Sequence, residues 1–447
     1  MTSNVPLCEN DQSDGQLPST TQPAAIHNPP ASEKNILGLP NEIVQEIASF
    51  LPTDHDVLRF SRTCRDMWAK VFAPESVVWR SLFTRCYDVP SVKASSELRH
   101  EYQTRAIVLR AKFNFAEKED DRQYLCMRVL KTMLEEAITV HLEQDCHSKT
   151  LDRLYESLKS MNLLKYPRKE GPSQLFFALQ LCLTPLALDS TVTQACHRTD
   201  YNLATLYSFA EELGEPYIDH VNLDLEKMLQ MRSFWQRHLL TASELTYSET
   251  FASLPAYMKP QVRKLDPDDG CKLSTSWLGV YSCLHPLPET QEEFELLNRQ
   301  TCADLETHVD VIDVMTLKLK VKPNADVFWP QICREIIPLV GPEIRRVYFE
   351  GKQNIHGITD EEDNTIFGFT EDIDVTYGEF SGWTRICFTI WQGDTSVNYA
   401  AFRTAMADAE WVHSYEALII PGGRVMLGRW VDTKDQTGRG PFIFWDV

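Results

Sequence analysis

Two adjacent cysteine–histidine pairs, Cys146-His147 and Cys196-His197, are the first candidates for nucleophilic or metal chemistry. Adjacent residues do not direct both side chains at one metal ion, and zinc sites use spaced ligands such as C-x₂-C with H-x₃-H, which this sequence lacks. The phosphate-binding loop, the G-x-S-x-G motif and the H-E-x-x-H motif are also missing. We therefore predict no catalytic residue, no metal site and no cofactor.

The densest acidic run is "TDEEDN", from Thr359 to Asn364. It lacks the alternating ligands, the central glycine and the closing glutamate of a calcium-binding loop. Two interpretations remain, a solvated loop or a site that attracts a basic peptide. Under the second, the substrate-binding candidates are Asp360, Glu361, Glu362 and Asp363, with Glu371, Asp372 and Asp374 following closely in sequence.

Composition limits the possible partners. The 447 residues include 64 acidic and 44 basic side chains, a formal charge of −20, which argues against binding to nucleic acids or anionic membranes. No apolar run reaches the roughly 18 residues of a membrane span, and the first 30 residues lack the apolar core of a signal peptide. The 12 cysteines follow no regular framework and indicate reduced thiols. We expect a cytoplasmic or nuclear protein.

Hydrophobic periodicity divides the chain. Residues 1–34 are polar and rich in proline, which predicts a disordered tail. A compact helical block is predicted over residues 35–88 and a helical scaffold over 89–262. In the scaffold, Pro172–Leu183 is apolar all round, as in a buried helix, and Val221–Leu240 has the pattern of an amphipathic helix.

Strand patterns replace helical ones in residues 270–447. Met315–Lys322 alternates apolar and polar residues, and "IIPGGRVML" places a Pro-Gly-Gly turn between two apolar runs. The chain ends in "GPFIFWDV", which predicts a final strand that closes the sheet. We predict an antiparallel β-barrel, since closure removes exposed sheet edges. The fold class is α+β.

The block at 35–88 is unusually apolar for its size. Pro40 suits the first turn of a helix whose apolar side chains cover more than one stripe. We predict three helices, the second starting at an N-cap of Thr53 or Asp54. Three helices in about 50 residues bury little surface by themselves. Part of their apolar surface is therefore expected to face a partner.

From Leu37 to Phe83 the chain resembles the F-box family. The matching positions are Leu39-Pro40, Glu42, Ile43, Ile47, Leu51, Leu58, Ser61, Cys64-Arg65 and Trp79. The family usually has a tryptophan three residues after the cysteine, where this chain has Met67 followed by Trp68. The resemblance implies docking on a Skp-type adaptor and, through it, on a cullin–RING ubiquitin ligase. The implied adaptor-binding residues are Leu39, Pro40, Ile43, Val44, Ile47, Leu51, Leu58 and Trp79.

The C-terminal half resembles two kinds of protein. "SWLGVY", Ser276–Tyr281, is similar to the first strand of lipocalin-like barrels, and "IIPGGRVMLGRW" with "GPFIFW" resembles the C-terminal domain of fungal-type F-box proteins. Six tryptophans are expected mainly in the barrel core, with one or two at its mouth; Trp277 is a substrate-binding candidate. These are Trp277, Trp383, Trp391, Trp411, Trp430 and Trp445.

Three functions remain open from the sequence. The first is a non-catalytic substrate receptor of a ubiquitin ligase, with an unidentified protein as substrate. The second is a lipocalin-like binder of a small ligand, coupled to the F-box. The third is a hydrolase whose site is not recognised. A deep apolar cavity in the barrel would favour the second, and clustered groups with shifted pKa values in a cleft would favour the third.

Overall fold

The structure is a computed structural model. It describes residues 36–88, 94–111, 121–139, 148–158, 172–189, 201–202, 205–206, 218, 223–241, 245–260, 273–283, 290, 292–293, 314–322, 329–341, 345–355, 364–373, 376–393, 406, 408–434, 436 and 438–447. The chain divides into two compact units, Met1–Ala73 and Pro74–Val447. We describe each unit by itself.

The N-terminal unit consists of short helices. These are η1 (Ile36–Gly38), α1 (Asn41–Ser49), α2 (Asp54–Ser61) and α3 (Arg65–Val71). Thr53 caps α2, since its hydroxyl accepts from the backbone N–H of Asp56 at 3.1 Å. The predicted second helix is divided into α2 and α3. Cys64 is extended there (φ −158°) and its thiol caps α3 by accepting from the backbone N–H of Met67.

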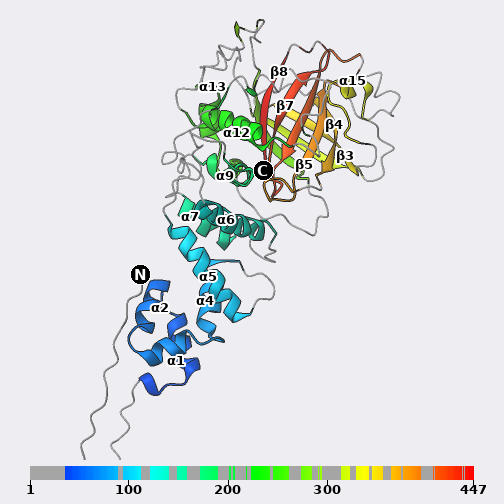
Figure 1. The fold of residues 1–447 in the computed structure, drawn as a ribbon. Helices are drawn as coiled ribbons and strands as arrows, with labels where there is room; N and C mark the ends of the chain where they lie inside the picture. Colours follow the sequence, from blue (N-terminus) through cyan, green and yellow to red (C-terminus); the bar gives the residue numbers. More distant parts are fainter. Residues whose placement is uncertain are drawn as a thin grey trace, which may run out of the picture. The chain divides into compact units, whose positions relative to one another are not determined.

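The second unit begins with helices (Figure 1). They are α4 (Val77–Cys86), α5 (Ser95–Arg110), α6 (Asp121–Thr139), α7 (Lys149–Leu158), α8 (Gln174–Cys182), α9 (Thr184–Ala187), α12 (Leu225–Leu240), α13 (Leu245–Ser253) and η3 (Ala256–Met258). Every residue of α8 from Leu175 to Cys182 is buried, as its apolar sequence predicts. Helix α12 packs on α8, on α13 and on the barrel strands β7 and β8, so it is buried on more sides than an amphipathic pattern indicates.

Eight antiparallel strands form a closed barrel in which each strand pairs with the next and β8 pairs with β1. The strands are β1 (Ser276–Tyr281), β2 (Met315–Val321), β3 (Arg346–Ile355), β4 (Asn364–Asp372), β5 (Thr384–Trp391), β6 (Val412–Ile419), β7 (Val425–Asp432) and β8 (Arg439–Asp446), with the short helix α15 (Gln331–Arg334) between β2 and β3. This topology is that of up-and-down barrels, the class that includes lipocalins. The predicted α+β fold and its closed antiparallel barrel are confirmed.

Several sequence signals fix the barrel. Strand β2 alternates buried and more exposed residues as predicted. Gly422 and Gly423 adopt positive φ angles of 101° and 69° in the predicted hairpin between β6 and β7. The predicted last strand, β8, pairs with both β7 and β1 and so completes the closure.

Side chains from all eight strands fill the barrel interior. The rings of Phe388 and Tyr415 stack with centroids 4.6 Å apart, and Phe442 lies 5.2 Å from Tyr415. A β-carbon on Gly368 would lie 2.4 Å from the Cys387 carbonyl oxygen and 2.6 Å from the Phe349 ring and the Phe388 β-carbon, so glycine makes room there for the neighbouring strand and the Phe349 ring. The strand residues of this core are Trp277, Met315, Leu317, Leu319, Phe349, Ile366, Ile386, Phe388, Ile390, Tyr415, Ala417, Ile419, Met426, Trp430, Phe442 and Phe444.

Candidate interaction surfaces

Helix α1 leaves large apolar side chains in solvent. Ile43 is 42% exposed, Ile47 38% and Phe50, at the helix C-cap, 77%. Their spacing of four and three residues places them on one side of the helix. Pro40, which precedes the helix, is also exposed. These residues form a continuous apolar stripe, which we call the α1 face.

The segment that leads into α1 is fixed by helix α3. The ammonium group of Lys70 donates to the carbonyl oxygens of Leu37 at 2.9 Å and of Leu39 at 2.7 Å. The side-chain amide of Gln45 donates in turn to the Lys70 carbonyl at 2.9 Å. These hydrogen bonds hold the Leu39-Pro40 entry against α3, so the α1 face has a defined shape before any partner binds.

The predicted adaptor-binding residues fall into three groups. Pro40, Ile43 and Ile47 are exposed, and Leu39, Leu51 and Leu58 are half-buried. Val44 and Trp79 are 0% and 3% exposed and are core residues, because their apolar side chains are covered by the chain itself. The prediction for these two is therefore revised from partner contact to support of the fold.

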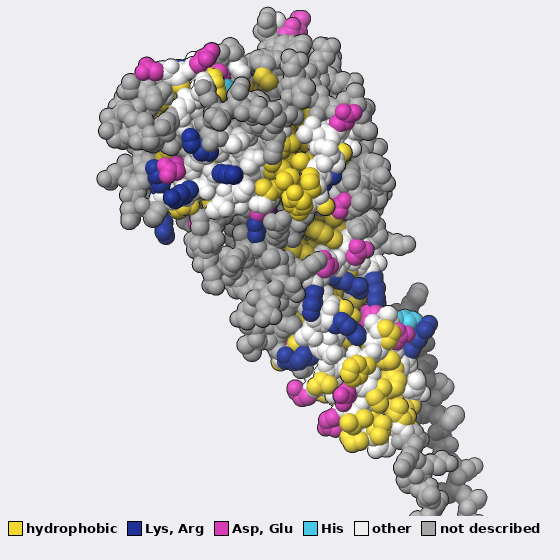
Figure 2. Space-filling view, turned by 180° about the vertical axis from the view of Figure 1, so that it is seen from behind, with side chains coloured by type: hydrophobic (Ala, Val, Ile, Leu, Met, Phe, Trp, Pro, Cys, Tyr) yellow, Lys and Arg dark blue, Asp and Glu magenta, His cyan; other side chains and the backbone are white. Residues whose placement is uncertain are grey.

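Several exposed apolar side chains, Phe50 and Trp68 among them, lie outside the predicted binding positions. Phe50 and Trp68 are 77% and 45% exposed, and Trp68 stacks on Phe72 with ring centroids 4.0 Å apart. Phe50 is not on the buried side of α1, which consists of Val44, Gln45 and Ala48, and a large apolar residue off that side indicates a surface position. Figure 2 shows hydrophobic side chains gathered on the N-terminal helices.

Residues 36–85 match the family model described as F-box-like. The chain has an F-box-like domain. F-box domains bind Skp-type adaptors, so the α1 face belongs to a domain whose family function is adaptor binding. No curated protein and no solved structure matches the chain in the comparisons.

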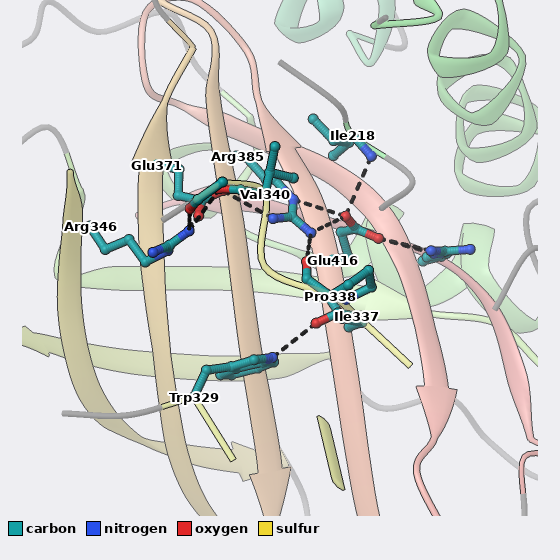
Figure 3. A network of polar contacts seen from close by, with 11 residues as sticks. Ile218, Trp329, Ile337, Pro338, Val340, Arg346, Glu371, Arg385 and Glu416 are labelled. Carbon is teal, nitrogen blue, oxygen red and sulfur yellow. Dashed lines mark hydrogen bonds and ion pairs between the residues drawn. The ribbon is translucent and has the colours of Figure 1, made fainter. Parts of the chain in front are cut away.

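Charged side chains form a buried row on the outer face of the barrel, within the second unit (Figure 3). Glu371 accepts from Arg346 at 2.6 Å and from Arg385 at 3.0 Å. Glu416 accepts from Arg385 at 2.6 Å and from Arg429 at 2.9 Å. The row therefore alternates in sign across five neighbouring strands, from β3 to β7.

The charged row also holds two chain segments on the barrel wall. Arg385 donates to the carbonyl of Pro338 at 3.0 Å, and Arg346 donates to those of Val340 and Gly341 at 2.8 Å. Glu416 accepts from the backbone N–H of Ile218 at 3.4 Å. The row is thus a structural network whose polar groups are satisfied by one another and by the segments they fix.

Burial and the neighbouring charges together set the protonation states around this row. Burial by itself raises the pKa of Glu416, but the positive charges of Arg385 and Arg429 outweigh it, and the pKa is lowered. Burial raises the pKa of the neighbouring Cys387 thiol well above its usual value. Glu416 is thus a stable carboxylate and Cys387 an unreactive thiol.

The predicted substrate residues have different outcomes. Trp277 is completely buried in the barrel core, where its indole N–H donates to the carbonyl of Ser274 at 2.9 Å, so it offers no surface to a substrate. Glu371, interpreted as part of an acidic loop, is instead a buried residue of β4 paired with arginines. The candidates Asp360, Glu361, Glu362 and Asp363 lie outside the described residues.

The described residues contain neither a metal-binding cluster nor a membrane-spanning helix. Within the described ranges, no group of three His, Cys, Asp or Glu side chains is placed to hold a metal ion. The pairs Cys146-His147 and Cys196-His197 lie outside these ranges. Among the helices that the structure describes, none is both long enough and apolar enough to cross a membrane.

Proposed function

We propose that this chain is a substrate receptor of a Skp–cullin–F-box ubiquitin ligase. The observation that carries the proposal is the α1 face, an exposed apolar stripe on an F-box-like domain. A Skp-type adaptor covers this face and connects the chain to a cullin–RING assembly. The C-terminal barrel domain recruits the protein substrate for ubiquitination and degradation, in the cytosol or the nucleus.

The chain contributes no acid, base or nucleophile in this proposal. A separate ubiquitin-conjugating enzyme carries the activated ubiquitin, and the receptor accelerates transfer by holding a substrate lysine near it. Burial of Cys126, Cys333 and Cys387 supports a non-catalytic role, since burial raises the pKa of each thiol and leaves it a weak nucleophile.

The filled barrel favours a protein substrate over a small ligand. Lipocalin-type binders hold their ligand inside an eight-stranded barrel. Here, stacked rings of Phe388, Tyr415 and Phe442 occupy the middle of the interior, and each is 0–1% exposed. A small ligand at that level would have to displace close-packed aromatic side chains, which is costly. The loops and ends of the barrel are therefore the surfaces assigned to recognition.

Adaptor capture tests the proposal. Truncating a central apolar anchor of an interface costs about 2 kcal/mol, or about thirtyfold in affinity. We expect the Leu39→Ala/Pro40→Ala double variant, and separately Ile43→Asp, to lose co-purification with a Skp-type adaptor. The matched control is Ile107→Asp on α5, because Ile107 is 71% exposed but lies outside the F-box-like domain.

Loss of adaptor binding can be distinguished from unfolding of a variant. Each variant is first compared with wild type by circular dichroism and thermal unfolding. Loss of adaptor in the first two variants, with Ile107→Asp unaffected, supports the α1 face as the adaptor site. Wild-type adaptor capture by the folded Leu39→Ala/Pro40→Ala and Ile43→Asp variants contradicts the proposed function.

Substrates are found by comparing two forms of the full chain. Proteins that co-purify with wild type and with the adaptor-deficient double variant, and that accumulate in cells carrying only the variant, are substrates. A proteasome inhibitor should remove the difference in abundance. If no co-purifying protein accumulates in cells that carry only the variant, the proposed receptor role is wrong, even if adaptor binding is confirmed.

A further inference from the structure

One end of the barrel carries four neighbouring rings that we call the aromatic row. The rings of Trp411 and His413 have centroids 4.7 Å apart, and His413 lies 4.9 Å from Trp430. Tyr281 meets Trp430 edge to face at 5.3 Å. Tyr281 is the last residue of β1, and Trp430 lies near the end of β7. Trp411 directly precedes β6, and His413 is the second residue of that strand. The antiparallel pairing brings these three strand ends together at one mouth of the barrel.

The aromatic row leads from the barrel core into solvent. Trp430 belongs to the core and is 4% exposed, and Tyr281 and Trp411 pack against the core while remaining half-buried. The His413 side chain is 23% exposed. The indole N–H of Trp430 donates to the carbonyl of Ser282 at 2.7 Å, which fixes the ring at the base of the row. The mouth therefore presents aromatic surface in a defined geometry.

A carboxylate stands at the edge of this surface. Asp432 is the register partner of His413, and one of its carboxylate oxygens lies 3.9 Å from the Nε2 atom of His413. The other oxygen accepts from the backbone N–H of Lys434 at 2.9 Å, which holds the group in place. The Lys434 ammonium itself donates to the carbonyl of Ala409. The Asp432 side chain is 17% exposed, so it is reachable and only partly screened by water.

We propose that the aromatic row and Asp432 bind a cationic side chain, an arginine or a lysine, of the protein substrate. The inference rests on the proposed receptor function and names the chemistry that the substrate must present. Aromatic faces attract cations through the negative face of the ring, and a nearby carboxylate adds a charge of opposite sign. The net charge of −20 further favours a basic segment during approach.

An apolar ligand fits this mouth less well. It would cover the Asp432 carboxylate, which has a backbone hydrogen bond from Lys434 and the His413 ring 3.9 Å away, without adding a cationic partner. Removing such a charge from water without adding a counter-charge costs free energy. A guanidinium or ammonium group supplies that partner while its methylene stem covers the rings. The combination of partly exposed rings at Tyr281, Trp411 and His413 with one fixed carboxylate therefore selects a cationic side chain.

Fluorine NMR of the full chain bound to its adaptor tests this site. The tryptophans are labelled as 5-fluorotryptophan, and the Trp411 and Trp430 signals are assigned with Trp411→Phe and Trp430→Phe. The probes are N-acetyl-arginine amide, N-acetyl-lysine amide and the neutral N-acetyl-citrulline amide. We expect the two cationic amides to shift the Trp411 and Trp430 signals in a saturable manner and the citrulline amide to leave them in place.

Two variants assign the charge contribution. Asp432→Asn keeps the hydrogen bond from Lys434 but removes the charge, and should weaken arginine amide binding about fivefold. The matched control is Asp372→Asn, an exposed carboxylate at the end of β4 and so at the opposite mouth, which should bind as wild type. The remaining tryptophan signals report whether each variant is folded.

Each outcome decides the inference. Equal shifts with arginine and citrulline amides, no shift with either cation, or unchanged affinity in folded Asp432→Asn would overturn it. Adaptor capture is measured on the same samples. Loss of the ligand response with intact adaptor capture overturns the cation site alone, whereas loss of adaptor capture by wild type would overturn the receptor function itself.

Discussion

Arg385 on β5 and Glu416 on β6 form an ion pair with 2.6 Å between nitrogen and oxygen, and both side chains are completely buried. Glu416 also pairs with Arg429 on β7, so one carboxylate joins three strands. Removing one member of a buried pair is costly because the other charge remains in a medium of low polarity. The stability of the barrel wall therefore depends on this carboxylate.

The first prediction is that Glu416→Gln lowers the free energy of unfolding by about 3 kcal/mol, since Arg385 and Arg429 lose their shared counter-charge. The control is Glu350→Gln, which breaks a partly exposed pair with Lys322 and should cost about 1 kcal/mol or less. Urea unfolding at pH 7 measures both. Equal small losses in the two variants would show that the buried row is not stabilising.

The same pair predicts a dependence on acid. The pKa of Glu416 in the folded chain is lowered below its usual 4.5, so its contribution to stability is fully present above about pH 4.5. It is lost as the pH falls below that value through the folded pKa. We expect wild type to lose stability more steeply than Glu416→Gln below pH 4.5. Parallel curves over this range would contradict the assignment.

A second titration concerns His238 on α12. Burial, with a smaller effect of the Arg237 charge, lowers its pKa to about 4, and its Nε2 atom lies 3.0 Å from the Tyr201 hydroxyl. The unfolded chain takes up this proton near pH 6.5, so stability falls as the pH drops from 6.5 towards 4. At pH 5 the loss is about 2 kcal/mol.

His238→Gln isolates this contribution, since glutamine does not titrate. We expect wild type to lose about 2 kcal/mol more than the variant between pH 7 and pH 5 in urea unfolding. The comparison cancels groups that titrate in both proteins. If the variant shows the same pH dependence as wild type, His238 is not held neutral in the folded chain.

Most elements of the fold follow from local pattern, but the buried charges do not. Alternation predicts β2, and Pro-Gly-Gly predicts the turn between β6 and β7. The local pattern does not predict strand β4, because both of its faces are buried and its sequence therefore lacks alternation. Its Glu371 has the residue type of a surface position, and only the register with β3 and β5 shows its arginine partners.

For the candidate sites too, local sequence pattern predicts the residues but not their exposure. The Leu39-Pro40 entry and the apolar residues of α1 are visible in sequence, but which of them face solvent depends on packing. Val44 and Ile47 are equally apolar, yet one is buried and the other is 38% exposed. In the aromatic row, Tyr281 contacts Trp430, although the two residues are 149 positions apart in the sequence. They meet because β1 pairs with β8 and β8 pairs with β7.

The fourth prediction concerns strand β8. Deleting residues from Pro441 onward removes Phe442 and Phe444 from the core and leaves the edges of β1 and β7 unpaired. Unpaired edges promote association between chains, so the deletion should aggregate. Removing Val447 alone is the control. Wild-type solubility and melting temperature in the longer deletion would contradict the role of β8 in closing the barrel.

The last prediction returns to Asp360, Glu361, Glu362 and Asp363. Strand β3 ends at Ile355 and β4 begins at Asn364, at the same barrel end as the aromatic row, so the connection that holds this acidic run leaves and re-enters the sheet there. Four carboxylates in succession increase the association rate of a basic segment, and salt screens such an effect. Reversing all four charges should therefore slow substrate capture without lowering the melting temperature. Asp372→Lys, at the opposite end, is the control.

Capture by wild type should also slow as salt rises from about 0.05 to 0.3 M. Unchanged association rates in both experiments would leave the run as a solvated loop.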